Sequence, residues 1–99
     1  MEVWYTREFE KYVKKMDRFS QWKVNKAVRN IWLKSGKCGN PLSGLPFFRE
    51  VRMNGKRLYF LLYEQTSKIV LVAVSNKKAQ QATINAIARK LKKYREYYS

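Results

Sequence analysis

The fold of this chain is decided by residues 49–60, Arg49-Glu50-Val51-Arg52-Met53-Asn54-Gly55-Lys56-Arg57-Leu58-Tyr59-Phe60. Asn-Gly between two runs of strand-forming residues is the strongest short-range signal for a β-hairpin, because both residues tolerate the positive φ angles of a tight turn. With Asn54 and Gly55 as the two loop residues, Met53 is expected to pair with Lys56. This stretch therefore predicts an antiparallel hairpin with a defined register.

The register sorts the hairpin into two faces, because side chains alternate along a strand. The apolar face is expected to carry Val51, Met53, Leu58, Phe60 and Leu62, and the polar face Glu50, Arg52, Arg57, Tyr59 and Tyr63. Arg52 pairs with Arg57, and like charges directly opposite each other destabilise a sheet. A bound anion would relieve this repulsion. The alternative is a solvated face in which Glu50, diagonal to Arg57, partly neutralises the arginine pair.

The charge of the chain favours an anionic partner. Twenty-two Lys and Arg against seven Asp and Glu, with no His, give a formal net charge of +15 on 99 residues. Such a field steers a protein toward polyanions, so nucleic acid, an acidic protein, or both would fit. An anionic membrane surface fits less well, because no apolar run reaches transmembrane length and no signal-peptide pattern opens the chain. We expect a cytoplasmic protein with no membrane partner.

Length and composition predict one domain over residues 1–99. Hydrophobic residues make up 45% of the chain and aromatic residues 15%, which is enough for a packed core. The single Cys38 excludes an internal disulfide and a Cys-rich zinc site. We therefore expect neither a metal nor another cofactor.

Hydrophobic periodicity predicts the order β-α-α-β-β-β-α. A short strand over residues 2–6 leads into a helix for which Thr6 is the expected N-cap. Ser20 is expected to cap a second helix, antiparallel to the first, which ends at Gly36 and Gly39. Residues 40–46 are predicted to form a loop. Strands are expected at about 47–53, 56–64 and 68–75, followed by a basic helix that begins after Lys77 and Lys78.

Four segments carry a resemblance to a known family. They are Asn40-x-Leu42-x-Gly44-Leu45-Pro46, then Glu50-x-Arg52, then Gly55-x-Arg57-Leu58-Tyr59-Phe60, and last an apolar strand running into Lys77-Lys78-x-Gln80-Gln81. Each motif is short, but their order and spacing over residues 40 to 90 resemble the RelE/ParE superfamily of toxins from prokaryotic toxin–antitoxin systems. The HigB-like branch is the most similar.

The resemblance implies a fold, an activity and partners. The fold is α+β: a small, mostly antiparallel sheet with an N-terminal helical hairpin and a C-terminal helix. Most members are ribosome-dependent endoribonucleases that cut mRNA by attack of the ribose 2′-OH on the adjacent phosphate, and no metal is required. The reaction needs a base, an acid and positive charge around the phosphate. The implied partners are the ribosome, mRNA and an acidic antitoxin, which would cover the basic sheet face or displace the last helix.

The resemblance also suggests site residues. Arg57 matches the phosphate-clamping arginine of the family, and a planar guanidinium can grip a phosphate through two N–H groups. Arg52 would share that anion, and Lys77 or Lys78 would supply charge to the leaving group. Glu50 is a candidate general base or a structural partner of Arg57. RNA contacts are expected from Lys56, Tyr59, Tyr63, Lys90 and Lys93.

The chain also departs from the family pattern. Several members carry a His or a Tyr near the carboxy terminus, whereas this chain has no His and places Thr83 or Ile84 near the position of that Tyr. The general acid and base therefore stay unassigned. The alternative function is a non-nuclease toxin of the same fold, such as a gyrase-directed ParE-like protein, or an inactive basic binding relative.

Overall fold

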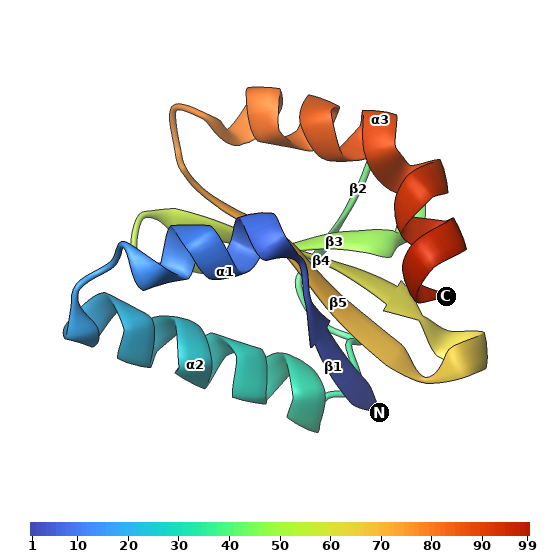
Figure 1. The fold of residues 1–99 in the computed structure, drawn as a ribbon, viewed down its shortest axis with the longest axis horizontal. Helices are drawn as coiled ribbons and strands as arrows, with labels where there is room; N and C mark the ends of the chain where they lie inside the picture. The colour runs from blue at the N-terminus through green and yellow to red at the C-terminus, as the bar shows by residue number, and fades with distance from the viewer.

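The computed structural model describes residues 1–99, in which one five-stranded sheet lies between two layers of helices (Figure 1). The strand order is β1-β5-β4-β3-β2. In chain order the elements are β1 (Glu2–Tyr5), α1 (Arg7–Lys14), α2 (Arg18–Leu33), β2 (Asn40–Leu42), β3 (Leu45–Met53), β4 (Lys56–Tyr63), a 3-10 turn (Glu64–Thr66), β5 (Lys68–Asn76) and α3 (Gln80–Tyr98). Helices α1 and α2 run antiparallel on one face of the sheet, and α3 covers the other face.

The predicted hairpin register is confirmed. Met53 pairs with Lys56 and Arg52 with Arg57, while Asn54 and Gly55 form the turn with φ angles of 49° and 77°. Strand β4 also pairs antiparallel with β5, and only β1 joins the sheet in parallel. The predicted α+β class with a mostly antiparallel sheet is therefore confirmed.

Two hydrophobic cores lie on opposite faces of the sheet because β4 and β5 contribute side chains to both. The core under α1 and α2 contains Leu58, Phe60 and Leu62 from alternate positions of β4. The core under α3 contains Tyr59 and Leu61 from the positions between them. The alternation of side chains along β4 therefore separates the two cores. Both faces of this strand are shielded from solvent.

The caps of the first two helices differ in how well the sequence predicted them. Thr6 is the N-cap of α1: its hydroxyl accepts a hydrogen bond from the amide of Phe9. The second helix begins earlier than expected, because Asp17 and not Ser20 is its N-cap, and the Asp17 carboxylate accepts the amide hydrogen of Ser20. Hydrogen bonding from Ser20, first through its side chain and then through its amide, lowers the pKa of Asp17.

Residues 40–42 form a strand where a loop was predicted. Asn40 pairs with Glu50 and Pro41 with Arg49 at the outer edge of the sheet, where a proline is tolerated because one side of an edge strand has no partner. Arg49 fixes the chain on both sides of this strand: it donates hydrogen bonds to the carbonyls of Cys38 and Gly39 before the strand and of Pro46 after it. The sequence did not predict β2, because a strand of three residues is too short to show an alternation of apolar and polar side chains.

No helix is long and apolar enough to cross a membrane.

The buried Thr6 side chain is expected to be a main anchor between α1 and the sheet. Besides capping α1, its hydroxyl donates to the carbonyl of Val72 over 3.2 Å, and the residue is 1% exposed. Thr6→Val keeps the shape and removes both hydrogen bonds, so the free energy of unfolding should fall by about 2–3 kcal/mol. Urea unfolding measures this loss. Thr66→Val, at an exposed position, is the matched control, and an equal loss there would contradict the assigned role.

Candidate functional site

A buried ion pair lies at the centre of the predicted site. Arg57 Nε is 3.2 Å from Glu50 Oε1, without the alignment of a hydrogen bond, and the two residues are 9% and 4% exposed. Gln80, the first residue of α3, donates its side-chain amide to both Glu50 carboxylate oxygens over 2.9 and 3.1 Å. The expected pairing of Glu50 with Arg57 is therefore present, but the solvated face expected with it is wrong, because both side chains are buried and α3 holds the carboxylate in place.

Exposed cations lie on the strand and in the turn that flank this pair. Arg52 lies directly opposite Arg57 on β3 and is exposed. On the other side of Arg57, Ser75 pairs with it near the end of β5. The exposed Lys77 and Lys78 follow in a turn closed by the Ala79 amide, which donates to the Asn76 side chain. The sheet thus brings three exposed cations and one buried arginine to the end where the hairpin turns and α3 begins.

Tyr59 lies in the core and not on an open face. It has no exposed surface, and its hydroxyl is 2.9 Å from the Ser75 hydroxyl. Burial raises the pKa of Tyr59, and the hydrogen bond with Ser75 opposes that shift. The RNA contact expected from Tyr59 is wrong, because α3 covers the ring. Tyr59 packs in the core under α3 and binds Ser75, and it cannot reach RNA in this structure.

The other predicted RNA contacts are dispersed. Lys56 lies on the opposite face of the hairpin, where its ammonium is 5.6 Å from the centre of the Tyr12 ring of α1. Tyr63 is half-buried at the far end of β4, and its ring stacks on Phe47. Lys90 lies midway along α3, 3.9 Å from Glu8. None of these three side chains joins the cations around Arg57.

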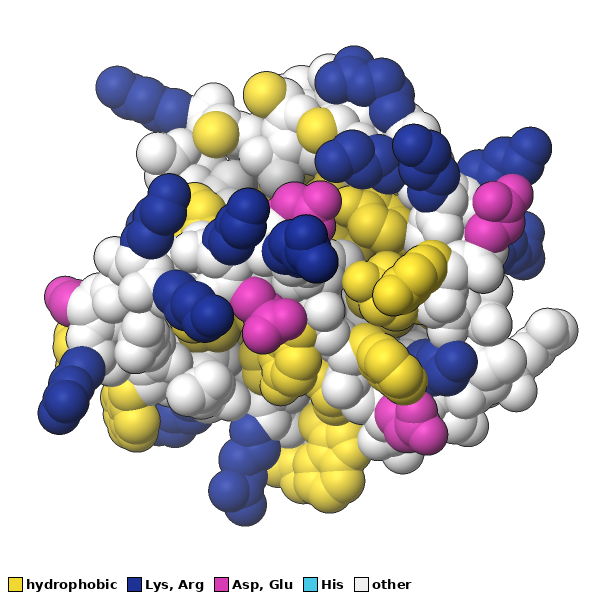
Figure 2. All heavy atoms as spheres, viewed as in Figure 1, with side chains coloured by type: hydrophobic (Ala, Val, Ile, Leu, Met, Phe, Trp, Pro, Cys, Tyr) yellow, Lys and Arg dark blue, Asp and Glu magenta, His cyan; other side chains and the backbone are white.

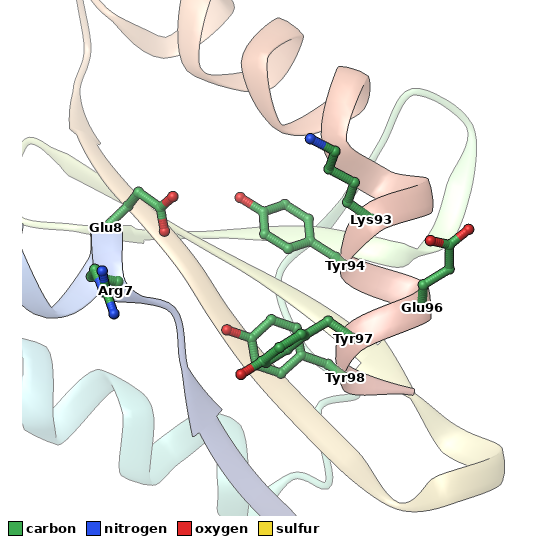
Figure 3. Close-up of a pocket in the computed structure, with 7 residues that line it drawn as sticks. All are labelled: Arg7, Glu8, Lys93, Tyr94, Glu96, Tyr97 and Tyr98. Atoms are coloured by element: carbon green, nitrogen blue, oxygen red, sulfur yellow. The ribbon is translucent and has the colours of Figure 1, made fainter.

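Lys93, the remaining predicted contact, lines a separate cavity between the start of α1 and the end of α3 (Figure 3). The cavity has a volume of about 460 Å³ and is lined by Arg7, Glu8, Lys93, Tyr94, Glu96, Tyr97 and Tyr98. In Figure 3 the three tyrosine rings extend from α3 toward Arg7 and Glu8. Tyr98 is held in place: Lys68 donates to its carbonyl, and its ring contacts Trp4. This cavity lies at the opposite end of α3 from Gln80.

Two site residues were missed by sequence reasoning. Gln80 belongs to the motif that follows the last strand, but nothing in the local pattern shows that it reaches Glu50, thirty positions away in the chain. Ser75 gave no signal, because a serine at the end of a strand is common. In the structure Gln80 binds the Glu50 carboxylate, and Ser75, the strand neighbour of Arg57, binds the Tyr59 hydroxyl. Nowhere do three His, Cys, Asp or Glu side chains come together as a metal site.

The buried pair should contribute far more to stability than an exposed one. Glu50→Gln keeps the shape but leaves Arg57 buried without its counter-charge, so the free energy of unfolding should fall by about 3 kcal/mol. Glu8→Gln is the matched control, because the Glu8–Lys90 pair is more than half exposed and should contribute under about 0.5 kcal/mol. Urea unfolding of both variants measures the difference. Equal losses would show that Glu50 and Arg57 do not act as a buried pair.

Tyr63 should show two opposite effects at neutral and alkaline pH. Its hydroxyl is buried without a hydrogen-bond partner, so Tyr63→Phe should raise the free energy of unfolding at pH 7 by about 1 kcal/mol. Burial raises the pKa of Tyr63 from 10.0 to about 12. Between pH 10 and 12 the unfolded chain therefore loses this proton first, and stability falls as pH rises. Tyr63→Phe should make that fall shallower, as measured by urea unfolding across the pH range. A steeper fall would contradict the burial of this hydroxyl.

No protein-family model matches the chain, and no curated protein matches it by sequence. Its structure, however, is similar to solved structures of RelE toxins. The isolated E. coli RelE toxin superposes with a TM-score of 0.68 at 16% identity, over 89% of this chain and 96% of that one. A chain of the intact E. coli RelBE toxin–antitoxin complex gives a TM-score of 0.67 at 17% identity, over 76% and 94%. A chain of the RelBE2 complex from Mycobacterium tuberculosis gives 0.63 at 19% identity, over 77% and 96%. At these identities the likeness is one of fold: this chain has the fold of the RelE toxins, as its resemblance to the RelE/ParE superfamily implied.

Proposed function

We propose that this chain is the toxin of a toxin–antitoxin system and a metal-independent endoribonuclease that cleaves mRNA on the ribosome. The observation that carries the proposal is the position of Arg52, Arg57, Lys77 and Lys78, which gather at one end of a RelE-type sheet. A net charge of +15 supports binding to a polyanion. Docking among ribosomal RNA phosphates would also make the affinity strongly dependent on salt. Membership of the HigB-like branch stays a prediction.

The proposed reaction is a transesterification within the RNA strand. The ribose 2′-oxygen forms a bond to phosphorus and the bond from phosphorus to the 5′-oxygen breaks, which leaves a cyclic phosphate and a free 5′-hydroxyl. The 2′-hydroxyl gives its proton to a base, and the 5′-oxygen receives one from an acid. Negative charge develops on the phosphate oxygens, where fixed cations stabilise it. The cations at the hairpin end suit that task.

The burial of the pair suggests different roles for the two arginines. Arg52 is exposed and would meet the phosphate first, whereas Arg57 contributes the guanidinium N–H groups that do not face Glu50. Lys77 and Lys78 would stabilise charge on the leaving oxygen from the turn before α3. Glu50 is 4% exposed and both of its carboxylate oxygens accept hydrogen bonds from Gln80, so it could accept the 2′-hydroxyl proton only if the contact with α3 opened. Because of that constraint we assign Glu50 first as the positioning residue for Arg57.

The proposed partners are an antitoxin, the ribosome and mRNA, in the cytoplasm. Two of the similar structures are complexes of RelE-type toxins with their antitoxins. A chain of charge +15 would be expected to take an acidic antitoxin.

Mapping of transcript 5′ ends after a short pulse of expression in a bacterial host tests the nuclease. Wild type should produce new cuts inside translated codons. Arg52→Ala should reduce them at least about tenfold, because it removes an exposed cation and leaves the buried pair intact. Arg57→Lys should reduce the cuts further, because lysine keeps the charge but lacks the planar guanidinium N–H groups that can bind two phosphate oxygens at once. Lys14→Ala, an exposed cation on α1, is the control.

Each variant is purified and its thermal midpoint measured, so that unfolding is separated from loss of chemistry. Cuts that persist in both arginine variants would show that Arg52 and Arg57 are not part of the cleavage site. Growth arrest without any cuts in wild type would contradict the nuclease and favour the gyrase-directed alternative, which DNA-damage signalling would reveal.

A further inference from the structure

The outer face of α2 carries a row of residues that the proposed nuclease does not use. Phe19, Trp22, Lys26, Arg29 and Leu33 follow one another at spacings of three, four, three and four residues. This spacing places side chains on a single helix face, in the heptad pattern of helix–helix contacts. We call these five residues the α2 stripe. The helix buries its other face through Val24, Val28 and Ile31.

The α2 stripe exposes an unusual amount of apolar surface. Phe19 is 62% exposed, Trp22 is 55% exposed and Leu33 is 59% exposed. In Figure 2 hydrophobic side-chain atoms reach the surface near both ends of α2, along the lower edge of the view, beside Lys and Arg. Single exposed apolar residues are common, but large ones repeated along one helix face mark an interaction surface. The anchors lie at the two ends of the stripe.

Positive charge occupies the centre of the stripe and its border. Lys26 lies 4.9 Å from the centre of the Trp22 ring and Lys23 lies 4.3 Å from that of Phe19. With Arg29, these side chains present a cationic centre, and α2 contains no acidic residue between Arg18 and Leu33. A partner that covers the stripe must therefore supply carboxylates opposite its middle and apolar groups opposite its ends.

We propose that the α2 stripe docks an amphipathic helix of an acidic protein. At 1.5 Å per residue the stripe is about 21 Å long, which suits three to four turns of a partner helix. That helix would place apolar residues near Phe19, Trp22 and Leu33 and Glu or Asp opposite Lys26 and Arg29. The assignment of this helix to the antitoxin rests on the proposed function above.

The charge and the ring contacts argue against two other occupants. A second copy of the chain would bring Lys26 and Arg29 of both copies toward each other, which like charges oppose. Single-stranded RNA would need free ring faces for base stacking. Lysines lie over Phe19 and Trp22, and the two rings are nearly parallel to each other at 6.1 Å between centres.

The stripe lies on the opposite side of the sheet from the Glu50–Arg57 pair. Helix α2 packs against the face that carries Leu58 and Phe60, whereas α3 covers the face of Arg57 and Tyr59. A helix docked on α2 would therefore hold the partner without occupying the cations at the hairpin end. Loss of the stripe should weaken partner binding and leave RNA cleavage unchanged.

The test uses the full chain and the protein encoded by the reading frame adjacent to its own. Titration calorimetry would compare wild type with Phe19→Ser/Trp22→Ser and with the charge reversal Lys26→Glu/Arg29→Glu. Each double variant should weaken binding at least about 30-fold, because the first removes two apolar anchors and the second places like charges opposite the carboxylates of the partner. Tyr97→Ser, which removes an 80% exposed aromatic ring, and Lys14→Glu/Lys92→Glu are the matched controls. Thermal midpoints confirm that all variants fold, and a 12-nucleotide single-stranded RNA is titrated in parallel.

The outcomes separate this inference from the proposed function. Weakening by both stripe variants but by neither control supports the inference. Unchanged partner binding overturns it and leaves the antitoxin proposal standing. Loss of RNA binding without loss of partner binding also overturns it and assigns the stripe to RNA. If wild type binds no adjacent-frame protein, both the antitoxin proposal and this inference fail, while transcript mapping still decides the nuclease.

Discussion

The ion pair between Glu50 and Arg57 is the interaction on which the rest of the structure depends. Gln80 completes it by donating hydrogen bonds to the Glu50 carboxylate. Both charges are almost fully removed from water, which is tolerable only if each has its partner at the right distance. The pair forms only in the register in which Asn54 and Gly55 make the turn, since a shift of one strand by one residue would place Glu50 and Arg57 on opposite faces of the sheet. Because Gln80 begins α3, the same pair also fixes where that helix starts on the sheet.

Strand β4 explains how a 99-residue chain can support two separate surfaces. Its side chains alternate between the core under α1 and α2 and the core under α3, so both layers are anchored to one rigid strand. Cations gather at the hairpin end near α3, and apolar side chains are exposed on the outer face of α2. The sheet between them keeps the proposed RNA site and the proposed docking surface apart.

The excess of positive charge is concentrated in exposed side chains, and this has consequences for both surfaces. Arg52, Lys77 and Lys78 have no acidic partner, and neither have Lys26 and Arg29 on α2. Charges of one sign repel each other and lower the stability of the compact state. Binding of an anionic partner at either surface would remove part of that repulsion, so stability and binding are coupled in this chain.

The sequence by itself determined the order of the elements apart from β2, and also the hairpin and its register, because these depend on local turn chemistry and on alternation along a strand. It also located the arginine pair and the lysines that follow β5. Alternation also implies that Lys56 lies on the face of Met53, away from Arg57, and in the structure its ammonium lies against the Tyr12 ring of α1. Only the tertiary structure decided that α3 covers Tyr59, that Gln80 binds Glu50 and that residues 40–42 pair as a strand. Those features join residues far apart in the chain, and the free energy of such contacts depends on how the layers pack and not on any local pattern.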